Sequence, residues 1–228
     1  MRLVLHHAPG CALSQAVRIA LAEKGLAHEV RTVDVASRHP DFLALSPAGL
    51  VPVLEAGGAV LTEAFFILCY LEDAFPQPPL GGADPAARYR VQYVGKLVEN
   101  AIAPNLALLE WAGGAGAMPA DVECLPGERR ALWRKAGAGF ADADLAAGRV
   151  ALERALADCE GWLAANAWLA GEDCTIADML VAPLAARVPA PGPATSRWLA
   201  RVRTRPAVAG VLAEPLLVTM GPERGRWG

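Results

Sequence analysis

The chain has 228 residues and a net charge of −3, with 21 basic and 24 acidic side chains. This length allows one large domain or two modest ones, and the lack of a basic patch argues against a nucleic-acid partner. Hydrophobic residues make up 54% of the sequence, yet no apolar run is long enough to span a bilayer, so no membrane partner is expected. The five cysteines are widely spaced and odd in number, which predicts a reducing, cytoplasmic setting without a metal cluster.

Residues 1–76 alternate between strand-like and helix-like segments, which predicts an α/β domain of the order β-α-β-α-β-β-α. The first helix begins at Cys11 and ends at Gly25, a residue that suits a helix C-terminus. An apolar helix from Glu63 to Phe75 closes the domain. The remaining expected elements are strands at residues 3–5, 28–35, 51–54 and 59–61, a short helix at residues 40–45, and a turn at residues 55–58.

Pro52 stands inside the strand predicted at residues 51–54. Because proline cannot donate to a strand ladder, it belongs on a sheet edge or at a special peptide bond. A cis Val51–Pro52 bond would turn the backbone of Val51 outward, toward an extended peptide ligand. From the local sequence alone an ordinary edge-strand proline is the favoured interpretation, since cis bonds are the minority even before proline.

Strand signals stop after residue 76. A linker rich in proline and glycine is expected at residues 77–83, and alanine- and leucine-rich helices fill residues 84–228, which predicts an all-helical second domain. Pro104 is expected to kink the first long helix, and Thr175 with Asp178 forms a capping box that opens a later one. Amphipathic helices are expected at residues 93–111, 145–163 and 194–212, with a loop at residues 113–127.

Cys11 is the candidate nucleophile, because it stands where the loop after the first strand meets the first helix. A helix N-terminus carries unsatisfied N–H groups and a partial positive charge, which favour a thiolate over a thiol. Cys11 also opens a Cys-x-x-Ser pattern that ends at Ser14. The alternatives are that Cys11 is a small buried apolar residue and that Ser14 is a solvated hydroxyl in the first turn.

Other candidates are weaker. His6 and His7 near the end of the first strand make a poor metal site with Cys11, because spacing and ligand number are wrong, and no metal is predicted. Trp111 and Met118 are candidates to line an apolar pocket, although an aromatic core beside a loop is an equal alternative. Cys69 and Cys159 continue apolar helix faces and are predicted to lie in the core.

Four segments together make the chain resemble the cytosolic glutathione transferase superfamily. They are residues 17–26 (VRIALAEKGL), 46–54 (SPAGLVPVL), 61–63 (LTE) and 168–178 (WLAGEDCTIAD), in the family's order and over nearly the whole chain. The resemblance implies an α/β thioredoxin-like N-terminal domain followed by an all-α helical bundle domain. It also implies glutathione as co-substrate, a small-molecule second substrate, a homodimer and a cis bond before Pro52.

The resemblance assigns roles to individual positions. Omega-like glutathione transferases have a cysteine in the place of Cys11, and other branches activate glutathione through a serine or tyrosine near this loop, for which Ser14 is the candidate. The backbone of Val51 beside Pro52 is expected to pair with the cysteinyl part of glutathione.

Glu63 and the first amides of its helix are expected to face the γ-glutamyl end of glutathione. The family usually has serine after this glutamate and often lysine or glutamine before the Val-Pro pair, whereas this chain has Ala64 and Leu50. Two polar contacts are therefore missing, and weak binding of glutathione is expected.

Three hypotheses remain open from the sequence. The first is a glutathione-dependent thiol transferase that uses the Cys11 thiolate. The second is a transferase that conjugates glutathione to an apolar electrophile. The third is a non-catalytic binding or regulatory protein that kept the fold and lost the ligand.

Overall fold

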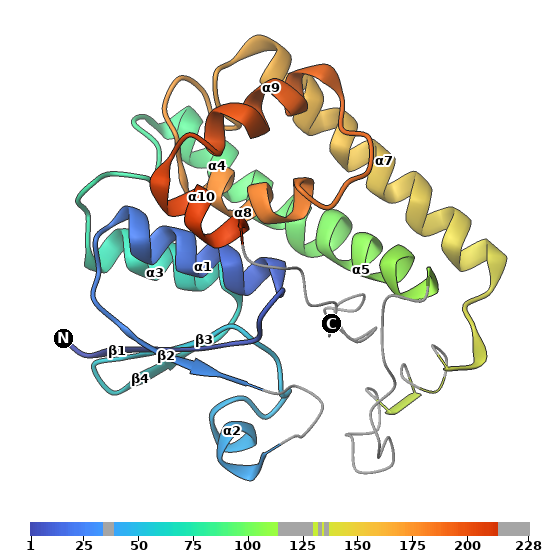
Figure 1. The fold of residues 1–228 in the computed structure, drawn as a ribbon. Coiled ribbons are helices and arrows are strands. Elements are labelled where there is room, and N and C mark those ends of the chain that lie inside the picture. Colours follow the sequence, from blue (N-terminus) through green and yellow to red (C-terminus); the bar gives the residue numbers. More distant parts are fainter. Residues whose placement is uncertain (34–38, 114–129, 132–133, 135–136, 214–228) are drawn as a thin grey trace.

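The computed structural model describes residues 1–33, 39–113, 130–131, 134 and 137–213. An α/β layer formed by the first third of the chain lies against helices formed by the rest (Figure 1). The predicted fold class, a thioredoxin-like N-terminal domain with an all-α C-terminal domain, is confirmed.

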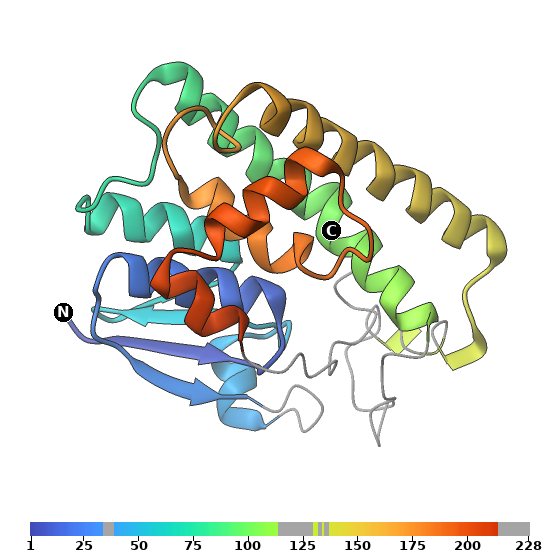
Figure 2. The same ribbon diagram turned by 45° about the horizontal axis from the view of Figure 1, so that its top comes forward.

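Four strands form one mixed sheet, in the order β2 (Glu29–Thr32), β1 (Leu3–His7), β3 (Val53–Ala56) and β4 (Ala59–Leu61). β1 pairs parallel with β2 and antiparallel with β3, and β3 pairs antiparallel with β4. Figures 1 and 2 show α1 (Ala12–Glu23) and α3 (Ala64–Ala74) on one side of the sheet and α2 (Pro40–Leu45) on the other. All five residues of β1 are buried, so the central strand is covered on both faces.

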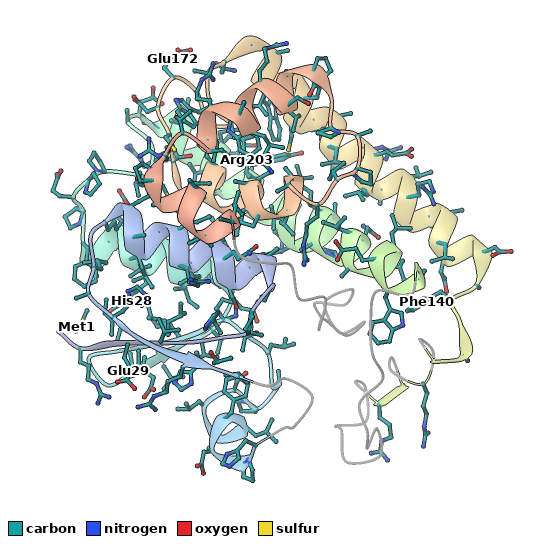
Figure 3. The ribbon with its side chains drawn as sticks, in the orientation of Figure 1. Met1, His28, Glu29, Phe140, Glu172 and Arg203 are labelled. Carbon is teal, nitrogen blue, oxygen red and sulfur yellow. The ribbon has the colours of Figure 1, made fainter. Side chains whose placement is uncertain are left out.

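Two of the predicted strands have different bounds. β2 is shorter than the predicted residues 28–35, of which residues 34 and 35 lie outside the described part. β2 is also an exposed edge, on which Figure 3 labels Glu29. Glu29 accepts hydrogen bonds from Arg2 and Arg31. β3 begins at Val53 rather than residue 51, because the Val51–Pro52 bond is cis and proline cannot donate to the ladder.

The hairpin turn is also narrower than expected. Only Gly57 and Gly58 turn the chain, with φ angles of 57° and 94° that glycine adopts without a steric penalty. Glu55 and Ala56 are therefore free to pair with β4, opposite Val60 and Ala59. This extends β3 toward its C-terminus and keeps the hairpin tight.

The helical part contains α4 (Pro85–Leu97), η1 (Val98–Ile102), α5 (Ala103–Ala112), α7 (Asp142–Ala165), α8 (Ile176–Ala185), α9 (Pro193–Val202) and α10 (Pro206–Leu212). α8 is buried along its whole length and packs against α1, so it joins the two parts of the molecule. The capping box of Thr175 and Asp178 at the start of α8 is confirmed. The helical segment expected at residues 194–212 is two helices, because the chain turns before Pro206.

The first long helix is interrupted as Pro104 predicts. The interruption is the π-helical segment η1, which ends just before α5, and Pro104 lies in the first turn of α5. The apolar spacing predicts that Tyr93, Leu97, Ala101, Pro104, Leu108 and Trp111 share one face of this helix. Tyr93 is nevertheless 44% exposed, and the buried positions of α4 and η1 include Val94, Val98 and Ile102. The loop predicted at residues 113–127 lies almost entirely outside the described residues. No helix in the described ranges is both long and apolar enough to cross a membrane.

Candidate functional site

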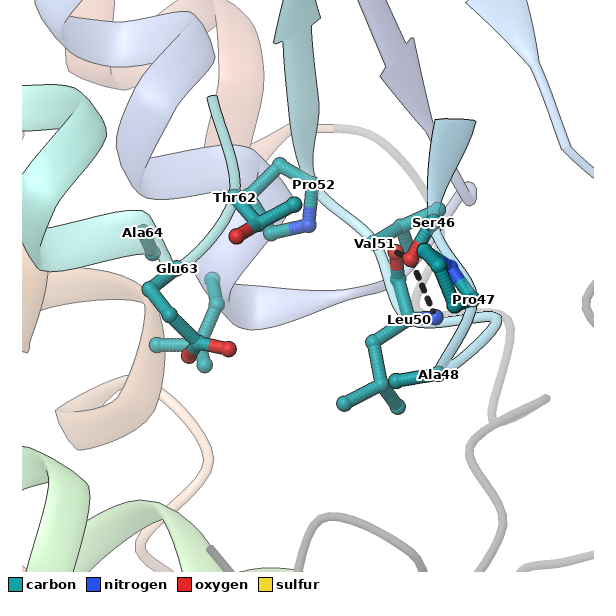
Figure 4. A pocket seen from close by; sticks show the side chains of 10 residues that line it. Ser46, Pro47, Ala48, Leu50, Val51, Pro52, Thr62, Glu63 and Ala64 are labelled. Atoms are coloured by element: carbon teal, nitrogen blue, oxygen red, sulfur yellow. Dashed lines mark hydrogen bonds between the residues drawn. The ribbon is translucent and has the colours of Figure 1, made fainter. Parts of the chain in front are cut away.

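A cavity of about 290 Å³ opens between the segment before β3 and the start of α3. Its lining includes all five residues predicted to contact glutathione: Leu50, Val51, Pro52, Glu63 and Ala64. Figure 4 shows Glu63 and Ala64 on one side of this cavity and Leu50 on the other. The sequence analysis assigned no contact with glutathione to the other residues that line it, which are Leu13 and four residues of the motifs at 46–54 and 61–63: Ser46, Pro47, Ala48 and Thr62.

The wall formed by residues 46–52 is held in shape by a local hydrogen-bond network. The hydroxyl of Ser46 donates to the Leu50 carbonyl at 3.0 Å and accepts the Leu50 N–H at 3.1 Å (Figure 4). Gly49, with a φ of 66°, donates its N–H to the Ser46 carbonyl at 2.7 Å. The cis Val51–Pro52 bond follows, as the resemblance implied. This turn fixes the Leu50 side chain at the cavity, where it offers no polar group.

The opposite wall is the N-terminus of α3. Glu63 precedes the helix with a φ of 64°, a left-handed value that is uncommon for a residue other than glycine. Such strained positions cluster at ligand sites. Ala64 is the first residue of the helix and is 4% exposed. Helix N–H groups therefore face a cavity to which Ala64 contributes no hydroxyl.

Glu99 is an acidic side chain that the sequence gave no reason to choose. A small recess next to the main cavity is lined by Glu63, Ala64 and Leu13 together with Glu99, which η1 carries from the helical part. Two carboxylates thus flank the start of α3. The only related signal in the sequence is Pro104. It predicts an irregular helix, but it does not predict that the side chain of Glu99 lines this recess.

Cys11 is the N-cap residue of α1, as predicted. Its Sγ accepts the N–H of Ser14 at 3.1 Å and lies 4.0 Å from the Val51 carbonyl oxygen, so the thiol faces the cis Val51–Pro52 segment. The residue has no exposed surface, because it packs in a small apolar cluster with Val33, Phe42, Val53 and others. The structure therefore places the thiol at a helix N-terminus and buries it, while its role as a nucleophile stays a prediction.

Ser14 is not the solvated hydroxyl that was the alternative for it. The residue is completely buried, and its Oγ has no hydrogen-bond partner. The neighbouring Gln15 is 1% exposed, and neither polar atom of its side chain has a partner. Buried polar groups without partners are uncommon in proteins, and they concentrate here beside Cys11.

The weaker candidates have structural surroundings. His6 is buried, and its Nε2 lies 2.7 Å from Glu55 Oε1 across the β1–β3 pair. No group of three or more possible metal ligands exists within the described ranges. Trp111 is 8% exposed, and Met118 lies outside the described residues, so the pocket predicted around them is not described.

Three other cysteines in the described part differ from Cys11 in their surroundings. Burial and the nearby Asp73 raise the pKa of Cys69 to about 11, although this residue is only partly buried rather than in the core as predicted. Burial and Asp158 raise the pKa of Cys159, a core residue as predicted, to about 12. Burial also raises the pKa of Cys174. These three side chains remain thiols at neutral pH.

Comparison with known proteins decides the family. The description "Glutathione S-transferase, N-terminal domain" matches residues 5–79, and "Glutathione S-transferase, C-terminal domain" matches residues 122–207. The chain belongs to the glutathione S-transferase family. The predicted resemblance to the cytosolic glutathione transferase superfamily is thereby confirmed, and with it the class of a glutathione transferase-like enzyme.

Individual known proteins also match over most of the chain. A probable maleylacetoacetate isomerase from Caenorhabditis elegans is 33% identical over 172 residues, which cover 74% of this chain and 70% of that protein. FtsZ-localized protein A from Caulobacter vibrioides is 31% identical over 228 residues, with 92% and 90% covered. The crystal structure of beta-etherase LigF from Sphingobium sp. strain SYK-6 has a TM-score of 0.82 at 26% identity, with 92% and 98% covered.

Proposed function

We propose that this chain is a glutathione-dependent thiol transferase in which Cys11 attacks a disulfide or a glutathionylated substrate. The observation that carries the proposal is the placement of Cys11 Sγ, which accepts the Ser14 N–H at the start of α1 and lies 4.0 Å from the Val51 carbonyl oxygen. A helix N-terminus stabilises the thiolate that performs such an attack. The cavity beside this segment is where glutathione binds.

Glutathione is held in this proposal mainly by backbone groups. The N-terminal N–H groups of α3 attract the γ-glutamyl carboxylate, while Glu63 attracts the ammonium of the same group. The cis Val51–Pro52 segment pairs with the cysteinyl part, which brings its sulfur to the side of the cavity nearest Cys11. Leu50 and Ala64 add no polar contact, so binding is weak.

The reaction consists of two thiol–disulfide exchanges. The Cys11 thiolate attacks the glutathionyl sulfur of a mixed disulfide, an S–S bond forms between them, and the substrate leaves as a thiolate that takes a proton. A second glutathione thiolate then attacks the sulfur of glutathione bound to Cys11, which releases oxidised glutathione and restores the Cys11 thiolate. Since Cys11 is completely buried, the segment around it or the lining of the cavity must shift for the first attack.

Activity assays on one preparation test this proposal. Thiol transfer to a glutathionylated peptide should be abolished by Cys11→Ser and unchanged by Cys69→Ser, because the pKa of Cys69 is raised to about 11. Thiol transfer that persists in Cys11→Ser would refute it. Conjugation of glutathione to an apolar electrophile, measured on the same samples, reports the competing reaction.

Two other functions have an observation in their favour. The Ser14 Oγ has no hydrogen-bond partner, so it has a donor left for a glutathione thiolate if the shift that exposes Cys11 also exposes this buried hydroxyl, which would suit conjugation. A non-catalytic function is supported by Ala64 and Leu50, which offer no polar side-chain group to a ligand in the cavity. Conjugating activity in Cys11→Ser supports the first, and a lack of glutathione binding supports the second.

The proposed assembly is a cytoplasmic homodimer that acts on a small molecule. Phe66 of α3 is 61% exposed, and Tyr89 and Tyr93 of α4 are 65% and 44% exposed, so large apolar side chains on neighbouring helices face away from the core. A second copy of the chain would cover them. Light scattering that shows a monomer at micromolar concentration would contradict this assembly.

A further inference from the structure

Arg187 connects the helical part of the molecule to the residue immediately before Cys11. It follows the end of α8, its side chain is 3% exposed, and its guanidinium donates to the Gly10 carbonyl at 2.8 Å. A second nitrogen lies 3.4 Å from the carboxylate of Glu110 on α5. One side chain thus joins α5, the end of α8 and the loop that carries Cys11.

This arrangement is a poor one for stability alone. The Nε of Arg187 is buried without a hydrogen-bond partner, and the contact with Glu110 is long for a charge-assisted bond. Burial raises the pKa of Glu110, and the opposing effect of the neighbouring Arg187 is smaller. A buried guanidinium that is incompletely paired costs free energy, and such costs are accepted where a side chain serves a functional site.

The Gly10 carbonyl, which accepts the 2.8 Å hydrogen bond from Arg187, determines how Cys11 is held. Gly10 has a φ of 75°, which a residue with a side chain rarely adopts, and the N–H of Cys11 donates to the Ala8 carbonyl at 3.1 Å. The Gly10 carbonyl belongs to the same peptide unit as the Cys11 N–H. Fixing that carbonyl therefore fixes the peptide plane from which Cys11 enters α1.

We propose that Arg187 is a positioning residue for Cys11, which holds the Gly10–Cys11 peptide so that the sulfur meets the Ser14 N–H and faces Val51. The proposal rests on the proposed function, because it assigns a role to the geometry of Cys11. It predicts that thiol transfer depends on a side chain 176 positions further along the chain, at the end of a helix of the other domain.

Arg205 provides a matched control. It also reaches from the helical part to α1, with two nitrogens 2.7 and 2.6 Å from the Glu23 carboxylate. Glu23 is the last residue of α1, whereas Cys11 caps its first turn. Loss of Arg205 therefore weakens the contact between the two parts of the molecule without touching the Cys11 loop.

The test compares Arg187→Met, Arg187→Lys and Arg205→Met, each verified as folded by circular dichroism. Arg187→Met should lower kcat for thiol transfer about ten- to hundredfold, with the KM for glutathione changed by less than about twofold. Arg187→Lys, which keeps a charged donor, should recover part of the loss. Arg205→Met should keep kcat within about twofold of the parent even though it loses stability.

Hydrogen exchange supplies a readout that does not depend on activity. Amides of residues 8–15 should exchange faster in Arg187→Met than in the parent, and at the parent rate in Arg205→Met. Equal losses of kcat in both methionine variants, or unchanged exchange over residues 8–15 in Arg187→Met, would overturn the role of Arg187. If Cys11→Ser keeps full thiol transfer, the proposed function fails, whereas the exchange comparison still decides whether Arg187 holds this loop.

Discussion

Ala64→Ser should tighten glutathione binding, because it adds a hydroxyl where the ligand's γ-glutamyl carboxylate is proposed to bind. Ala64 is the first residue of α3 and lines the cavity at 4% exposure, so the new Oγ would stand beside the helix N–H groups that face the ligand. A hydrogen bond to a charged group is worth about 1.5–3 kcal/mol, which corresponds to roughly ten- to a hundredfold in affinity.

Ala48→Ser is the control for this prediction. Ala48 lines the same cavity from the opposite wall, so the variant adds the same hydroxyl away from the start of α3. Calorimetric titration with glutathione should show the gain in Ala64→Ser alone. Equal gains in both variants would mean that the added polarity, not the helix N-terminus, improves binding. Tight binding by the parent protein, with no gain in either variant, would refute the reasoning about Ala64.

Two further predictions concern the helical bundle. The Asp178 carboxylate accepts hydrogen bonds from the Leu169 N–H, the Thr175 N–H and hydroxyl, and Trp198 Nε1 at 2.8–3.1 Å. Because Asp178→Ala leaves these buried donors unpaired, it should lower the free energy of unfolding measured in urea by about 3–5 kcal/mol. A loss below about 1 kcal/mol would contradict this prediction. Burial raises the pKa of Glu160, but hydrogen bonds from Thr195 and Ala194 outweigh it and hold the pKa below 4.5. The unfolded chain therefore binds this proton more readily than the folded chain does, so Glu160 stabilises the fold above pH 4.5 and this stabilisation is lost as the pH falls below that value. In Glu160→Gln, the free energy of unfolding, measured by urea titration above and below pH 4.5, should fall less with pH than in the parent. An unchanged pH dependence in Glu160→Gln would show that Glu160 does not contribute to it.

The parts of the fold that the sequence predicted well depend on local residues. Thr175 and Asp178 form their capping box within one turn, and Gly57 with Gly58 makes a hairpin turn through its own backbone. Helical and strand periodicity depends on neighbours a few positions away, so the order of elements was also readable. The local sequence did not predict the cis bond before Pro52, and only the resemblance to a family indicated it.

The candidate site was harder to predict, because it is assembled from distant segments. Val33 and Phe42, from the end of the β2 segment and from α2, bury Cys11, and no local signal shows that they meet it. Glu99 lines the recess at the start of α3 from the π-helical segment η1, which is far away in the sequence. Arg187 contacts Gly10 through tertiary packing alone. Residues 50, 51, 52, 63 and 64, which line one cavity, were predicted to contact glutathione only through the resemblance to a family.

The most direct test of the central claim is the site at which glutathione disulfide modifies the protein. After incubation with oxidised glutathione and digestion, peptide mass spectrometry should find a glutathione adduct on Cys11 first, since its sulfur accepts a helix N-terminal N–H. Cys69, Cys159 and Cys174, whose pKa values are raised, should remain unmodified in the same sample. Reduced glutathione should then remove the adduct. If Cys11 stays unmodified, or reacts no faster than Cys69, the assignment of Cys11 as the reacting thiol is wrong.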